Sequence, residues 1–309
     1  MLLLKRGDYL PRERGNWDSK VVFADGKYVA DETFYDIDDN TFHPELHYFV
    51  GGNSKVYGAA LFRLAPHDFE DVRHPSGVAP AWPISYADLE PYYVKAEHLY
   101  CTGCTAATVR IRSPAPPART TGIHPSRMPP VSHCIRCDRV DGFPCLLGTK
   151  ADAEWAVVRP ALAAHPNLTL MTSATVQQLL TDPSGRVVSG VVTTMADGST
   201  NTFSADIVVL SAGSILSSVL LLKSANDTHP AGLGNSSDVV GRHYMRHNNL
   251  ALMAFSKNPN PTVFQKTLSL NDLGAALLEG HGPGPGSALY VTRFGGSSRF
   301  LVRSAVRCL

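Results

Sequence analysis

The chain of 309 residues is long enough for two domains of ordinary size, and its 44% hydrophobic and 18% charged residues are typical of a globular protein. A formal net charge of +1 gives no case for binding nucleic acid, which needs a basic face, or a membrane surface, so no nucleic-acid partner is expected. Apolar runs such as VLLL (219–222) are far below the roughly 20 residues of a membrane span. The three leucines before Lys5 are too few for a signal peptide. We therefore expect no membrane span and a cytoplasmic location.

The first segment, LLLKRGDYLPRER (2–14), is typical of a strand end followed by a loop. A dinucleotide-binding unit has a strand, a G-x-G-x-x-G turn and a helix before such a point, and that fingerprint is absent. The glycine-rich run GHGPGPGS (280–287) contains prolines and follows no strand, so it is interpreted as a loop.

The next segment, HYFVGGNSKVYGAALFR (47–63), brings a strand-like run at 48–50 to two adjacent glycines. Adjacent glycines allow positive φ angles and close approach of another group to the backbone. Two explanations remain open at this point. The glycines form a tight turn, or they lie against an anion such as a pyrophosphate with Asn53 and Ser54 as hydrogen-bond donors.

The most regular stretch is 167–225, where short strands alternate with the turn sequences DPSGR and ADGST. This pattern predicts a β-meander. Its last strand, in NTFSADIVVLSAG (201–213), is apolar throughout Ile207–Leu210 and is expected to be buried on both faces. Helical spacing of apolar residues after Gly213 predicts a helix, with Ser214 or Ser217 as its cap. A buried strand, a glycine and a helix N-terminus form a common nucleotide-binding geometry.

The six cysteines raise the question of a metal site. They lie at 101, 104, 134, 137, 145 and 308, and two of the spacings are Cys-x-x-Cys. Paired spacing of this kind occurs in zinc sites. The surrounding sequence shows no supporting strand or helix pattern, so unpaired thiols and no metal site are expected. A small cysteine-based metal-binding protein remains an alternative.

Two stretches differ in composition from the rest. Residues 98–137 contain five arginines and six prolines but no acidic residue, and Glu279 is the only acidic residue after 273. A linker and a flexible tail explain this pattern, and so does a slipped reading frame. The tail 273–309 is therefore expected to be disordered or frame-shifted.

Several segments together resemble the glucose–methanol–choline (GMC) family of FAD-dependent oxidoreductases, especially its bacterial dehydrogenase-like branch. They are LLLKRGDYLPRE (2–13), VGGNSKVYGAALFR (50–63), SAGSILSSVLLLKSAN (211–226), VGRHYMRH (240–247) and, more weakly, DGFPCLLGTKADAE (141–154). The resemblance implies that residues 51–58 lie against FAD. The residues that it places along the cofactor are Gly51, Gly52, Asn53, Ser54, Gly58, Val176 and Gly213. Val176 would present its backbone to the adenine.

The sequence also departs from the family pattern. Lys5 stands where the family has a carboxylate for the adenosine ribose, and an ammonium can only donate hydrogen bonds. Weaker adenosine binding, or a preference for an extra phosphate, is expected. The C-terminal catalytic histidine of the family has no counterpart, since His281 lies in an unrelated setting. No catalytic residue is assigned.

These observations predict an α/β fold. It comprises a partial FAD-binding domain (Rossmann-like, glutathione-reductase-type) with a β-meander, in segments 1–70 and 151–245. Segments 71–150 and 246–309 would form an incomplete substrate-binding region. The expected function is hydride transfer from the CH–OH group of a small-molecule alcohol or sugar to FAD. An inactive, truncated or frame-shifted remnant is the alternative. The oligomeric state, the electron acceptor and the identity of the substrate are not predicted.

Overall fold

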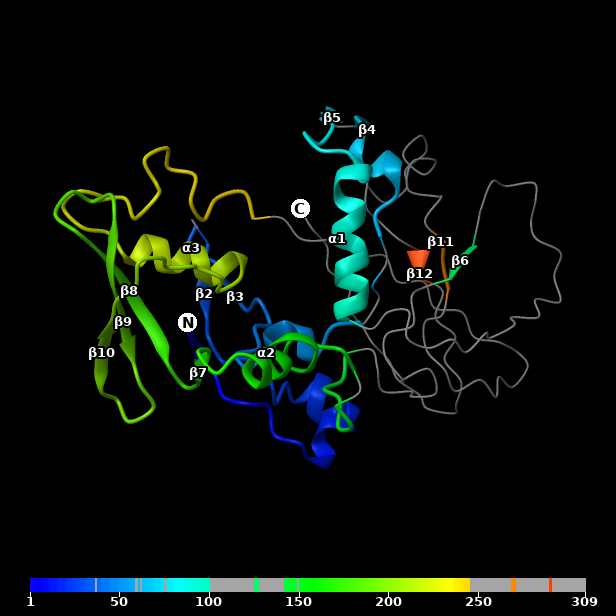
Figure 1. The fold of residues 1–309 in the computed structure, drawn as a ribbon, viewed down its shortest axis with the longest axis horizontal. Helices are drawn as coiled ribbons and strands as arrows, with labels where there is room; N and C mark the ends of the chain where they lie inside the picture. The colour runs from blue at the N-terminus through cyan, green and yellow to red at the C-terminus, as the bar shows by residue number, and fades with distance from the viewer. Residues whose placement is uncertain are drawn as a thin grey trace. The chain divides into compact units, whose positions relative to one another are not determined.

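The computed structural model describes residues 1–36, 38–58, 61, 63–74, 77–100, 125–127, 142–148, 150–244, 268–270 and 289–290 (Figure 1). The chain divides into two compact units. One comprises residues 1–57 and 143–247, and the other comprises 58–142 and 248–309. The domain ranges expected from the sequence stay a prediction.

A parallel pair of strands opens the first unit. Strand β1 (Leu2–Leu4) pairs with β7 (Thr169–Met171), and Leu3 lies opposite Leu170. The pairing continues beyond the strands, because the Lys5 N–H donates to Met171 O (2.9 Å) and the Ala174 N–H donates to Lys5 O (3.0 Å). The predicted strand at the start of the chain is therefore confirmed, and its pairing fixes the backbone of Lys5.

The predicted β-meander is also confirmed. Strands β8 (Thr175–Thr181), β9 (Val188–Thr194) and β10 (Thr200–Phe203) form an antiparallel sheet in the order β10-β9-β8. The DPSGR and ADGST segments form the turns between them. The sheet contributes Leu179 and Val191 to the first hydrophobic core, where they pack with Leu220 and Leu233.

Helix α3 (Ser214–Lys223), which the helical spacing predicted, packs against β8 of this sheet (Figure 1). The buried Ser224, just after the helix, fastens it to β8. Its hydroxyl accepts the Leu179 N–H (2.9 Å) and donates to Leu220 O (2.6 Å). The predicted serine cap is wrong. Gly213 occupies the cap position with φ = 87°, and Ser217 Oγ instead accepts the N–H of Ala212 (3.1 Å).

The expectation for Ile207–Leu210 is wrong as well. This segment belongs to no strand, and Ile207 and Val209 are 80% and 78% exposed. Only Val208 and Leu210 pack against the first core. An apolar strand is buried on both faces only where other elements cover both. The described residues cover one face of this segment, so alternate side chains remain exposed.

The rest of the first unit consists of short elements. They are 3₁₀ turns at Arg14–Trp17 and Gly52–Lys55, π-helical turns at Lys20–Ala24 and Glu154–Val158, strands β2 (Phe34–Tyr35) and β3 (Thr41–Phe42), and helix α2 (Arg159–Ala164). A second core joins Val22, Tyr28 and Phe143, with Phe49 against it. Residues 143 and 49 are distant in sequence, so this core brings the ends of both stretches of the unit together.

The second unit contains helix α1 and two small sheets. Their bounds are β4 (Val72–His74) with β5 (Gly77–Ala79), α1 (Tyr86–Leu99), and β6 (Pro125–Arg127), β11 (Leu268–Leu270) and β12 (Leu289–Tyr290), together with a 3₁₀ turn at Pro66–Phe69. Ser85 and Asp88 form a capping box at the start of α1. The Arg63 guanidinium donates to both carboxylate oxygens of Glu97 (2.7 and 2.8 Å).

Most of the two stretches with unusual composition, 98–137 and 273–309, lies outside the described residues. Among the helices of the described part, none has the length and apolar character needed to cross a membrane.

Replacing Ser224 with alanine tests the attachment of α3. Ser224→Ala should lower the free energy of unfolding by about 1–3 kcal/mol, because the buried Leu179 N–H loses its acceptor. The matched control is Ser218→Ala in the same helix, since the exposed Ser218 hydroxyl only donates to Ser214 O. The control should change the free energy by less than about 0.5 kcal/mol. Equal losses in urea denaturation would contradict the assignment.

Candidate functional site

The two adjacent glycines form a tight turn. Gly51 and Gly52 have φ angles of 97° and 54°, and the Gly52 N–H donates to Phe49 O (2.7 Å). The strand expected at 48–50 is absent, because two successive left-handed residues reverse the chain direction at this point. The turn continues as the 3₁₀ turn Gly52–Lys55. We call Gly51–Ser54 the glycine turn.

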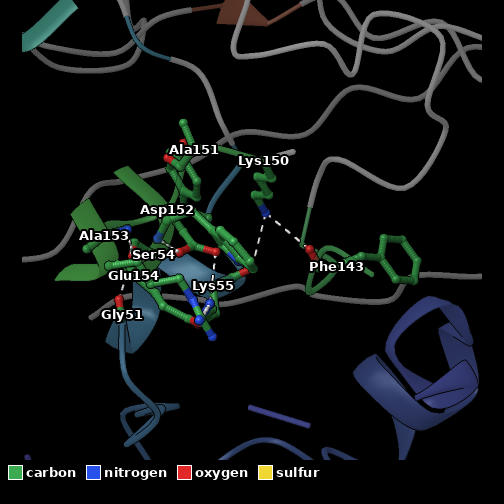
Figure 2. Close-up of polar contacts among 12 residues, drawn as sticks. Gly51, Ser54, Lys55, Phe143, Lys150, Ala151, Asp152, Ala153 and Glu154 are labelled. Carbon is green, nitrogen blue, oxygen red and sulfur yellow. Dashed lines mark hydrogen bonds and ion pairs between the residues drawn. The ribbon is translucent and has the colours of Figure 1, made fainter. Parts of the chain in front are cut away.

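Two polar side chains hold the glycine turn in place. Asn53 Oδ1 accepts the N–H of His47 (3.0 Å). Ser54 Oγ donates to Gly51 O and accepts the N–H of Ala153 (3.0 Å), as Figure 2 shows. The exposed Asn53 keeps its Nδ2 amide without a partner among the described residues. Ser54 therefore fastens the turn, whereas Asn53 can still donate a hydrogen bond to another group.

A buried ion cluster lies directly behind the turn. Lys55, Asp152 and Glu154 are only 4%, 1% and 4% exposed. The Lys55 ammonium donates to Asp152 Oδ2 (3.1 Å) and to the Glu154 carboxylate (Figure 2). Glu154 also accepts from the half-exposed Arg159 guanidinium, at 2.7 Å from Nε and 2.6 Å from Nη2. A cation on each side thus balances the Glu154 carboxylate.

Lys150 adds a second buried ammonium to this region. Its Nζ donates to Lys55 O (3.3 Å) and to Phe143 O (3.2 Å), as Figure 2 shows. It also lies 4.9 Å from the centre of the Tyr57 ring. The Tyr57 hydroxyl in turn donates to Ala151 O (2.6 Å). Residues 51–57 and 150–154 are therefore joined at several points, along both the side chains and the backbone.

The cluster has an electrostatic cost. Burial raises the pKa of Asp152 above its usual value, and the opposing effect of the Lys55 ammonium does not cancel it. Removing charges from water costs several kcal/mol per ion, and the attraction between partners offsets this only with good geometry. A contribution to the stability of the fold therefore does not by itself explain the ion cluster, and its specific geometry needs another explanation.

A further lysine lies close to the front of the glycine turn. Lys5 Nζ is 3.9 Å from the position that a Cβ atom on Gly52 would occupy, and His47 O is 3.8 Å from it. Burial lowers the pKa of the Lys5 ammonium. The space beside Gly52 thus has a cation at its edge, and both His47 O and Lys5 Nζ lie within 4 Å of the Cβ position. This combination of an open glycine, an ammonium and the Asn53 amide suits an anionic or polar group such as the phosphates of FAD.

The other residues expected along the cofactor lie elsewhere. Val176 lies in β8, partly buried against the first core, and Gly213 begins α3 with φ = 87° and nothing within 4 Å of a Cβ. Gly58 is the first residue of the second unit. The structure therefore brings Gly51, Gly52, Asn53 and Ser54 together in one turn, and it puts Val176 and Gly213 in the meander and helix of the same unit.

Sequence reasoning missed Lys55, Lys150, Asp152 and Glu154. Charged residues are ordinarily exposed, and nothing in the local pattern marks these as buried. One signal was present, because the weakest of the resembling segments, 141–154, contains three of the four.

A small pocket of about 160 Å³ borders the ion cluster. Its lining includes Arg12, Lys55, Glu154, Trp155 and Arg159. The guanidinium groups of Arg12 and Arg159 lie 4.6 and 4.5 Å from the centre of the Trp155 ring. Of these two cations, Arg159 also pairs with the Glu154 carboxylate.

The cysteine alternative falls outside the described residues for the most part. Of the six cysteines, only Cys145 is described. Within the described part, no group of three or more His, Cys, Asp or Glu side chains is arranged to hold a metal ion.

Comparison with known proteins identifies the family. The family model described as GMC oxidoreductase matches residues 48–249, which include the glycine turn, the ion cluster, the β-meander and α3. The chain belongs to the GMC oxidoreductase family. This match confirms the resemblance, and with the mixed strands and helices it confirms the α/β class.

The GMC relatives include two characterised bacterial enzymes. The chain is 31% identical over 221 residues to 6'''-hydroxyparomomycin C oxidase of Streptomyces lividus, covering 62% of this chain and 40% of the relative. It is 26% identical over 242 residues to the fructose dehydrogenase large subunit of Gluconobacter japonicus, covering 68% and 43%. A crystal structure of pyridoxine 4-oxidase from Mesorbium loti aligns at 17% identity with a TM-score of 0.42, covering 72% and 46%. The chain thus spans about two fifths of the length of the curated relatives.

A glycine substitution tests the packing of the turn against the ion cluster. Gly198→Ala, in the turn between β9 and β10, introduces a Cβ at φ = 82° with nothing within 4 Å, and should cost about 1–2 kcal/mol. Gly51→Ala adds close contacts, 3.0 Å to Lys55 Cε and 3.3 Å to Glu154 N. It should therefore reduce the free energy of unfolding further than Gly198→Ala does. Equal losses in thermal or urea unfolding would show that the turn is not packed as described.

Proposed function

We propose that this chain forms the cofactor-binding part of an FAD-dependent oxidoreductase that acts on CH–OH groups. Membership of the GMC oxidoreductase family supports this proposal, as do relatives named as an oxidase and a dehydrogenase. The observation that carries it is local. An open glycine backbone lies beside the Lys5 ammonium and the Asn53 amide, in a turn fixed from behind by buried ions.

The residues proposed to hold FAD are Gly51, Gly52, Asn53, Ser54, Gly58, Val176 and Gly213, with Lys5 added from the geometry. Asn53 Nδ2 and the Lys5 ammonium would donate to phosphate oxygens or to the edge of the flavin ring. Gly52 would permit the close approach that a side chain would block. Ser54 would act indirectly, by holding the turn in place, because its hydroxyl already bridges Gly51 and Ala153.

The chemistry that FAD supplies when bound is acceptance of a hydride from the alcohol carbon. The chain would contribute binding and orientation of the cofactor, through the turn and the residues around it. No catalytic acid or base is assigned among the described residues. The proposed substrate is a small-molecule alcohol or sugar, in keeping with the names of the relatives.

A binding titration with lysine variants tests the cofactor site. FAD fluorescence should be quenched on addition of the full chain, and Lys5→Met should weaken binding by about 10-fold or more, since a charge-assisted hydrogen bond contributes about 1.5–3 kcal/mol. Lys20→Met is the matched control, because the exposed Lys20 pairs with Asp25. It should leave the affinity unchanged.

Two outcomes would contradict the proposal. A chain that leaves FAD fluorescence unchanged binds no cofactor, and the proposed function fails. A chain that binds FAD with the same affinity in both lysine variants has its site elsewhere than beside Lys5.

A further inference from the structure

The buried charges of the described part gather at one place. All four buried charged side chains there, those of Lys55, Lys150, Asp152 and Glu154, lie behind the glycine turn. The two lysines balance the two carboxylates in formal charge. Buried ion pairs distributed without regard to function would not all be expected beside the same turn.

A contribution to stability alone does not explain why these charges gather there. Buried ion pairs are often no more stabilising than well-packed apolar residues of similar size. Their best-attested use is to specify one geometry among several, because an ammonium and a carboxylate must keep their hydrogen bonds when both are out of water. The question is therefore which geometry these charges specify.

The contacts lead directly to the glycine turn. Lys55 is the last residue of the 3₁₀ turn that Gly52 begins, and its Cε lies 3.0 Å from the Cβ position of Gly51. Asp152 and Glu154 hold the ammonium of Lys55, while Asp152 Oδ1 accepts the N–H of Glu154 (2.9 Å) and fixes its own loop.

A second connection runs in parallel. Ser54 Oγ joins Gly51 O to the N–H of Ala153, the residue between the two carboxylates (Figure 2). The backbone of the turn is thus tied at both ends to the 152–154 segment. Because Gly51 and Gly52 have wide conformational freedom, a turn without these ties would sample many other shapes.

We infer that Lys55, Asp152 and Glu154 are positioning residues that set the shape of the glycine turn for FAD without touching the cofactor themselves. The inference rests on the proposed function. It assigns the affinity for FAD partly to charges behind the turn, in addition to the Lys5 and Asn53 groups that are proposed to face the cofactor.

The test separates shape from stability with two variants. Lys55→Met removes the ammonium that contacts both buried carboxylates and leaves Glu154 with Arg159 in its place, so it should reduce both stability and FAD affinity. Lys55→Met combined with Asp152→Asn removes one charge of each sign, leaves Glu154 paired with Arg159, and should recover much of the lost stability. The double variant should still bind FAD about 10-fold more weakly than the wild type, because the ion pairs of Lys55 that hold the turn are absent.

Two further measurements distinguish positioning from a general loss of structure. In the FAD-free protein, hydrogen exchange of a peptide spanning 47–57 should accelerate in the double variant, while exchange across β8 and β9 should stay unchanged. Gly198→Ala is the structural control, because its positive φ strains the turn between β9 and β10, which contains none of the residues proposed to hold FAD. It should lose stability and keep wild-type FAD affinity.

The outcomes are distinguishable from failure of the proposed function. A wild-type chain that takes up no FAD overturns the proposed function, and the inference with it. A wild type that binds FAD, with a double variant that binds equally tightly, overturns the inference alone. Equal weakening of FAD binding in Gly198→Ala and the double variant would also overturn the inference, because affinity would then follow stability.

Discussion

The Lys55 ammonium lies between the Asp152 and Glu154 carboxylates, and this contact joins positions 97 and 99 residues apart in the chain. Long-range contacts of this kind cost chain entropy, and burying the ions costs hydration. Residues 151–153 make two further hydrogen bonds to residues 51–57. The Ala153 N–H donates to Ser54 Oγ, and Ala151 O accepts from the Tyr57 hydroxyl. Residues 51–57 and 150–154 thus form one structural element, and the glycine turn is its exposed edge.

The other side of the glycine turn depends on the parallel pairing of β1 and β7. This pairing fixes the backbone of Lys5 through hydrogen bonds to Met171 and Ala174, and its side chain reaches the open space beside Gly52. The turn therefore has an ammonium in front, at Lys5, and a balanced ion cluster behind. In the proposed function, the front would supply charge to the cofactor and the back would hold the turn in a fixed shape.

The predictions that the structure confirms came from patterns within short segments of the sequence. The meander and α3 followed from alternating strands, Asp/Gly turns and helical spacing, all of which are read within a few residues. The strand predicted at 48–50 and the two-sided burial of Ile207–Leu210 were wrong because both depend on neighbouring elements, which a single segment does not reveal. The glycine turn was identified from its residues. Its ion cluster was not, because Lys55 and its partners are far apart in sequence.

The central claim is that the glycine turn contacts FAD, and amide NMR of the 15N-labelled full chain tests it most directly. On addition of FAD, the amide signals of Gly51 and Gly52 should shift, because the cofactor would lie beside their backbone. The signal of Gly198, in the turn between β9 and β10, should not move. Shifts confined to other residues, with Gly51 and Gly52 unchanged while FAD binds, would contradict the account.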